Sequence, residues 1–150
     1  MGLDAVVYKK EDHVDAQLRE KYKLKLDKKT GELYLNDEDA MSLDVPVCEF
    51  EAIEKRLGNA ILIADAKKII SKYTTPDSIL MSNILFSGSH CGTVISCQKN
   101  DDLLMNVEHV INKVKVREDV ESLGYIIKLL NDIVDLINVS KVEGNPIVFV

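Results

Sequence analysis

The sequence predicts an α+β domain in which helices dominate and a small β-sheet includes both ends of the chain. Apolar residues recur at helical spacing in three long segments, and short runs rich in β-branched residues stand near both termini. The chain has 150 residues, of which 46% are hydrophobic and 29% charged, a composition typical of one globular domain. We therefore expect residues 1–150 to form a single domain around one core.

The first elements expected are strands and a polar helix. Leu3–Tyr8 is a β-branched run, and so is Pro146–Val150 at the other end of the chain. Apolar residues that continue to the last position favour a terminal strand held in a sheet, so we expect both runs in the same sheet. Glu11–Lys21 is predicted to form a polar helix. In Tyr22–Asn36 apolar residues alternate around a glycine-containing loop, which predicts a β-hairpin.

The middle of the chain is expected to be a loop followed by two helices. Asn36–Pro46 is acidic and has no long apolar run, so it is assigned to a loop. A short helix is expected over Glu49–Leu57, with Gly58 as its stop signal. A second helix is expected over Asn59–Tyr73, where apolar residues recur at helical spacing before a proline.

The second half of the chain is expected to contain one short strand and three helices before the terminal strand. Asp77–Phe86 is almost uniformly apolar, which suits a buried helix or a buried strand, and we favour the helix. Ser87–Gly92 consists largely of small residues and predicts a turn, and Thr93–Ser96 predicts a strand. Asp101–Val114 and Arg117–Asn138 each carry an apolar face at helical spacing, so both are predicted to be long helices.

The charge of the chain excludes one class of partner and suggests another. The formal net charge is −6, which opposes affinity for nucleic-acid phosphates. Between residues 30 and 54 the acids have no Lys or Arg among them; they are Glu32, Asp37, Glu38, Asp39, Asp44, Glu49, Glu51 and Glu54. Such a surface would steer a basic protein into contact. The alternative is that these acids only keep the protein soluble.

The turn at Ser87–Gly92 is the best candidate for catalysis, because it combines Ser89, His90 and Cys91. Cys91 or Ser89 would be the nucleophile and His90 the acid or base. The structural explanation is that glycines supply unusual backbone angles and that His90 bonds a backbone carbonyl. No phosphate-binding glycine motif occurs, and the His and Cys spacings match no zinc pattern, so we expect neither a cofactor nor a metal.

Signals for export or membrane insertion are missing from the sequence. The N-terminal residues lack the basic and apolar regions of a signal peptide, and the longest apolar stretch carries charges that a bilayer span would not. The chain has three cysteines and no Cys-x-x-Cys pair, which suits free thiols in a reducing compartment. We expect a cytoplasmic protein that binds no membrane.

Three short segments carry a family resemblance: Met1–Tyr8, Arg56–Asn59 and Phe86–Gly92. Together they resemble small bacterial cytosolic proteins, some of which are similar to immunity partners of contact-dependent or secreted polymorphic toxins. The resemblance implies a protein without enzymatic activity that occludes the active site of a cognate toxin and so protects the cell that produces it. It implies no catalytic residue.

The leading hypothesis is therefore an immunity-type protein that binds its toxin stoichiometrically through an acidic surface. The residues expected to contact the toxin are Asp37, Glu38, Asp39, Asp44, Glu49 and Glu51, with Phe50 as an apolar anchor among them. The alternative is a small hydrolase or transferase acting through the turn at residues 87–92. A third hypothesis is a homo-oligomer that associates through the helix expected at Arg117–Asn138, whose simpler explanation is a central core helix.

Overall fold

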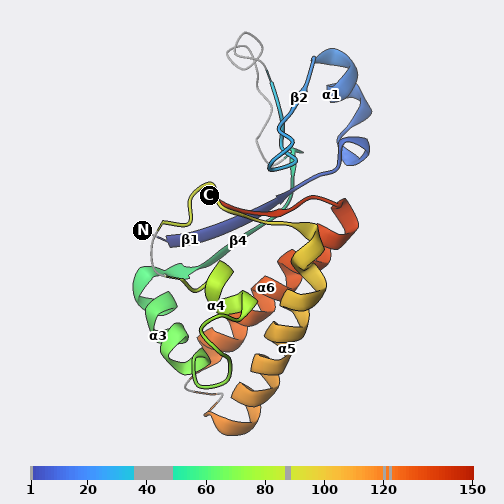
Figure 1. The fold of residues 1–150 in the computed structure, drawn as a ribbon. Coiled ribbons are helices and arrows are strands. Elements are labelled where there is room, and N and C mark those ends of the chain that lie inside the picture. Colours follow the sequence, from blue (N-terminus) through green and yellow to red (C-terminus); the bar gives the residue numbers. More distant parts are fainter. Residues whose placement is uncertain (1, 36–48, 87–88, 120, 122) are drawn as a thin grey trace.

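The computed structural model of this chain describes residues 2–35, 49–86, 89–119, 121 and 123–150. A four-stranded antiparallel sheet has the longer helices packed on one of its sides, and a small lobe with a two-stranded hairpin stands beyond the sheet from these helices (Figure 1). This arrangement confirms the predicted α+β class, in which helices dominate and the sheet is small.

The sheet has the strand order β4-β1-β6-β5. Its strands are β1 (Gly2–Tyr8), β4 (Glu51–Asn59), β5 (Val94–Ile95) and β6 (Ile147–Phe149). β1 and β6 are direct antiparallel neighbours, with Val6 opposite Val148. The prediction that both ends of the chain share one sheet is therefore confirmed, and so is the strand expected at Thr93–Ser96.

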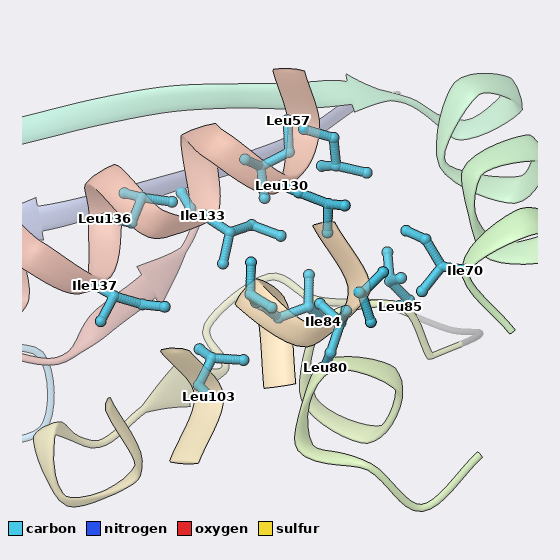
Figure 2. Close-up of a cluster of buried hydrophobic side chains, with 14 of the residues drawn as sticks. Leu57, Ile70, Leu80, Ile84, Leu85, Leu103, Leu130, Ile133, Leu136 and Ile137 are labelled. Carbon is cyan, nitrogen blue, oxygen red and sulfur yellow. The ribbon is translucent and has the colours of Figure 1, made fainter. Parts of the chain in front are cut away.

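The helices bury one face of this sheet. They are α3 (Ala60–Ile70), α4 (Ile79–Asn83), α5 (Asn100–Arg117) and α6 (Gly124–Glu143). α6 contributes Leu130, Ile133, Leu136 and Ile137 to the core shown in Figure 2, where side chains of α3, α4, α5 and β4 meet them. Because its neighbours surround so much of its surface, α6 is the central core helix. No helix in the described part of the chain combines the length and apolar character needed to span a bilayer.

The small lobe follows β1 in the sequence. It consists of a 3₁₀ turn at Glu11–His13, α1 (Ala16–Lys21), β2 (Lys25–Leu26) and β3 (Leu33–Tyr34), and the last two confirm the predicted hairpin. The Glu143 carboxylate at the end of α6 accepts hydrogen bonds from the backbone N–H of Lys10, at 2.8 Å, and from the His13 ring. These contacts tie the lobe to the helical layer.

The helix expected over Glu49–Leu57 is wrong, because this segment is the strand β4. Ile53 and Leu57 contact the core while Glu54 and Arg56, which lie opposite Val6 and Asp4 of β1, occupy the other side of the strand. Apolar residues four positions apart satisfy both the helical period and the alternation of a strand, so this spacing could not separate the two. The segment forms a strand because it pairs with β1 in antiparallel orientation.

The other expected helices differ from the structure mainly in where they begin and end. The helix expected over Glu11–Lys21 is interrupted at Val14, whose side chain is buried, and restarts after Asp15, which caps α1 by accepting from the Gln17 N–H. Arg117 ends α5 instead of beginning the next helix, and α6 starts at Gly124. The loop expected at Asn36–Pro46 lies outside the described residues. The helices expected at Asn59–Tyr73 and Asp77–Phe86 are present in shorter form, as α3 and α4.

Candidate functional site

Four carboxylates gather where the hairpin lobe meets the sheet. Asp27 and Glu32 stand on either side of the hairpin loop, where the Asp27 N–H donates to the Glu32 carbonyl at 2.9 Å. Glu51 and Glu54 come from the first part of β4, and Glu51 lies opposite Tyr8 at the end of β1. All four act electrostatically on the Tyr8 hydroxyl, so all four lie near it. We call Asp27, Glu32, Glu51 and Glu54 the carboxylate cluster.

The proximity of these groups alters their ionisation. Burial, together with the negative charges of the cluster, raises the pKa of Tyr8 to about 12. Burial and repulsion from Asp27 raise the pKa of Glu32. The pKa of Glu51 is raised by burial, by repulsion from Glu54 and by a hydrogen bond with the Glu54 carboxyl. The fold therefore holds like charges together at a cost that protonation relieves.

No cation of the described residues neutralises the cluster. The ion pairs among these residues join Lys55 to Asp132 and Asp135, and Arg56 to Asp4, on the part of β4 beyond Glu54. The remaining pairs involve α5, α6 and the lobe, and none includes Asp27, Glu32, Glu51 or Glu54. The carboxylate cluster therefore has no ion-pair partner among the described residues, although Lys28 and Lys29 stand in the hairpin loop between Asp27 and Glu32.

The structure places some of the acids that sequence reasoning selected. Glu49 is exposed immediately before β4, and Glu51 belongs to the carboxylate cluster. These acids belong to a strand and its approach, not to the first turns of a helix as expected. Asp37, Glu38, Asp39 and Asp44 lie outside the described residues.

Phe50, the expected apolar anchor, lies inside this chain. Its side chain is only 8% exposed and packs against Val14 and Leu33 of the lobe. A ring held in this way fixes the lobe against the start of β4. It offers little surface to a partner.

Sequence reasoning did not count Asp27 at all, and it counted Glu32 and Glu54 in the acidic run without selecting them as contact residues. The run of acids between residues 30 and 54 starts after the hairpin loop, so Asp27 was not counted with it. The predicted hairpin carried the necessary signal, because pairing of Leu26 with Leu33 brings the residues that follow and precede them face to face.

The Ser89, His90 and Cys91 side chains line a cavity of about 550 Å³ beside α3. Cys91 is an exposed free thiol, and His90 is half-buried. The α3 side of the cavity includes Lys67, and its other walls are mainly apolar. The structure therefore brings the three candidate catalytic residues to one hollow, with residues 87 and 88 of the same turn outside the described part of the chain.

The His90 ring is held by structural contacts. Its Nε2 lies 2.6 Å from the Ile84 carbonyl oxygen, and the ring stacks on Phe86 with a centroid distance of 4.0 Å. An edge contact with Phe149 adds to this. These are the contacts that the structural explanation of the turn predicts. Among the described residues no hydrogen bond joins His90 to Ser89 or Cys91, so a nucleophile–base pair is not assembled.

Metal chemistry finds no support in the described part of the chain, where no group of three or more His, Cys, Asp or Glu side chains is arranged to hold an ion. The carboxylate cluster is included in that statement. The sulfur of Cys97, another free cysteine, lies 3.5 Å from the Ser140 hydroxyl oxygen.

Comparison with protein-family models, with curated proteins and with solved structures finds no match to this chain. A proposal about function must therefore start from the two features described above, the carboxylate cluster and the cavity beside α3.

Proposed function

We propose that this chain binds a basic surface of another protein through the carboxylate cluster. The observation that supports this most directly is that four carboxylates meet at one surface without an ion-pair partner among the described residues. Burial and mutual repulsion raise the pKa of Glu32 and Glu51, and a cationic partner would gain affinity by relieving the repulsion. Opposite potentials would also accelerate the encounter.

We further propose that the partner is a bacterial toxin and that binding blocks its active site. This more specific proposal comes from the resemblance of three short segments to immunity partners of polymorphic toxins. The acids Asp37, Glu38, Asp39 and Asp44 follow the hairpin closely in the sequence and would enlarge the negative surface. A toxin that cleaves nucleic acid has a basic active site, which such a surface would cover.

The first experiment is purification of the tagged protein from its native cells, followed by mass spectrometry of stoichiometric partners. We expect one partner with a basic domain, and we expect that domain to lose its toxicity when this chain is produced with it. A partner without a basic domain, or a basic domain whose toxicity is unchanged, would contradict the proposal.

Charge-reversal variants then test the surface. Glu32→Lys with Glu54→Lys should weaken the complex by at least about thirtyfold, because each reversal replaces attraction by repulsion. The control, Asp102→Lys with Glu108→Lys, makes the same change in net charge at exposed positions of α5 and should change the affinity less than about threefold. Lysines at Asp37, Glu38 and Asp39 should also weaken binding. Equal losses in the cluster variant and in the control would show that net charge alone matters.

A further inference from the structure

The cavity beside α3 has the size and walls of a small-molecule site. On one side it is lined by Ala60, Ile63, Ala64 and Lys67, which share one face of α3 because their spacing follows the helical repeat. Ala60 and Ala64 are small, so this face of α3 leaves room beside the helix. The cavity has a volume of about 550 Å³, which lies within the range of pockets that bind small organic ligands.

The other walls of the cavity are apolar over most of their extent. Leu85 and Phe86 precede the turn, and Leu3 comes from the start of β1. Leu85 is almost fully buried, and Phe86 is fixed by its stacking contact with His90. These walls are therefore preformed, and a ligand that fills the cavity would need an apolar body.

Charge distinguishes this cavity from the rest of the molecule. Lys67 lines it, and none of the described Asp or Glu side chains does, although the chain has 25 acidic and 19 basic residues. Ser89 and His90 add polar groups beside the apolar walls. An anionic head group placed near Lys67 would therefore meet an ammonium group, with hydrogen-bonding side chains beside it.

We propose that this cavity binds a small aliphatic carboxylate, with its alkyl chain against Leu3, Leu85 and Phe86 and its carboxylate toward Lys67. The site lies at the Leu3 end of β1, whereas the carboxylate cluster lies at the Tyr8 end. The two sites use different residues, so the ligand is independent of the proposed protein partner.

The test compares three probes of equal chain length: octanoate, octan-1-ol and octylamine. Binding is followed by NMR through the backbone amide signals of ¹⁵N-labelled protein at pH 7. We expect octanoate to bind with a Kd near or below about 1 mM, and octylamine at least about tenfold more weakly, with octan-1-ol between them. Equal affinity for octanoate and octylamine would overturn the assignment of an anionic ligand, and no binding of octanoate would overturn the site.

Two pairs of variants locate the site. Ala64→Trp fills the cavity and should weaken octanoate binding at least about tenfold, whereas Ala16→Trp makes the same change at an exposed position of α1 and should leave it unchanged. Lys67→Gln should weaken binding of octanoate about fivefold and leave that of octan-1-ol unchanged. Lys68→Gln, next to it but outside the cavity lining, is the control. An Ala64→Trp variant that binds octanoate normally would overturn the proposal.

A measurement on the unsubstituted protein does not depend on how the variants fold. Cys91 lines the cavity and Cys97 does not, so saturating octanoate should slow alkylation of Cys91 by iodoacetamide at least about threefold and leave Cys97 unaffected. Unchanged alkylation of Cys91 at saturation would place octanoate elsewhere on the protein and contradict the proposal.

Discussion

At the scale of single residues, the most consequential polar group in the core is the Ser140 hydroxyl. It is fully buried on α6, donates to the Asn145 carbonyl oxygen at 2.6 Å and accepts from the Asn100 side-chain amide at 2.9 Å. The hydroxyl therefore joins α5, α6 and the approach to β6. Asn100 is buried as well, and its Oδ1 has no hydrogen-bond partner in the described structure.

Replacing Ser140 by Ala should lower the free energy of unfolding by about 2 kcal/mol, because the buried Asn100 amide and the half-buried Asn145 carbonyl lose their partner. Urea denaturation followed by circular dichroism measures this loss. Ser82→Ala is the control, since the Ser82 hydroxyl is exposed and bonds the Ser78 carbonyl oxygen within one turn of helix. It should cost less than about 0.5 kcal/mol, and equal losses at the two positions would contradict the structural role of Ser140.

Cys91 offers a residue-scale test of the hydrolase alternative. Because Cys91 is exposed and Cys97 is half-buried beside Ser140, Cys91 should react with iodoacetamide faster than Cys97 at pH 7. The informative comparison is with a small free thiol such as glutathione. A rate of Cys91 close to that of glutathione is expected from exposure alone. A rate more than about tenfold higher would indicate an activated thiolate and would favour catalysis at the turn.

At the scale of elements, helix ends show how local residues control the fold. Gly144 ends α6 in the left-handed conformation, with φ at +69°, and its N–H donates to the Ser140 carbonyl at 2.8 Å. α3 starts at Asn59, whose side chain accepts from the Leu62 N–H at 2.8 Å. Both signals are local, but only the Asn59 boundary was predicted, because the expected helix ended at Asn138 whereas α6 continues to Glu143.

Two substitutions of Gly by Ala separate the capping role from the general effect of added side chains. Gly144→Ala should lower the free energy of unfolding by about 1 kcal/mol, because a Cβ disfavours the left-handed conformation. Gly124→Ala stands at the first position of α6 in open space and should be neutral or stabilising by up to about 1 kcal/mol. Thermal unfolding of both variants checks this, and a loss of equal size in Gly124→Ala would contradict it.

The elements that sequence reasoning found are those whose signal is local. A β-branched run predicted each of the strands β1 and β6. Helical spacing of apolar residues predicted α3 and α5. β4 did not, because the four-residue interval between Ile53 and Leu57 fits either structure and its partner strand is about fifty residues away. The cavity could not be predicted from the sequence for a similar reason. Ala64 and Lys67 line the same cavity as Cys91 only because tertiary packing brings α3 beside the turn. The acidic surface was visible in part because its members cluster in sequence.

At the scale of the whole molecule, charge is distributed unevenly along the sheet. The Tyr8 end of β1 faces the carboxylate cluster, whereas the helical layer balances its charges in pairs such as Lys128 with Asp132, at 2.7 Å, and Lys141 with Asp101, at 2.7 Å. Paired and unpaired charges respond differently to pH, so the stability of the protein should report on the cluster.

Stability should increase as the pH falls from 7 to 5. The pKa values of Glu32 and Glu51 are raised in the fold, so their stabilising contribution is complete below the pKa of the unfolded chain and is lost as the pH rises through the folded pKa. We expect a gain of about 0.5 kcal/mol between pH 7 and pH 5, measured by urea denaturation. The Tyr73 hydroxyl and Lys72 lower the pKa of Glu118. Protonation of Glu118 therefore lowers the stability of the fold, but at lower pH than this range.

Glu51→Gln assigns this pH dependence to the cluster. The variant should be more stable than the unsubstituted protein at pH 7, by about 0.5 kcal/mol, and should gain less on acidification. Asp102→Asn removes an exposed carboxylate of α5 and should preserve the full pH dependence. If lowering the pH from 7 to 5 stabilises both variants as much as it stabilises the unsubstituted protein, the carboxylate cluster is not the source of the pH dependence.

The position of β6 has a consequence for how the protein is made. This strand lies between β1 and β5, although it follows both of them in the sequence. During translation β1 can pair with β4 early, but its other edge stays unpaired until Val148 has left the ribosome and can pair with Val6. Until that moment the nascent chain carries an open strand edge, because α6 and β6 are synthesised one directly after the other. The interval is a window for contact with other chains, and it closes when β6 pairs with β1.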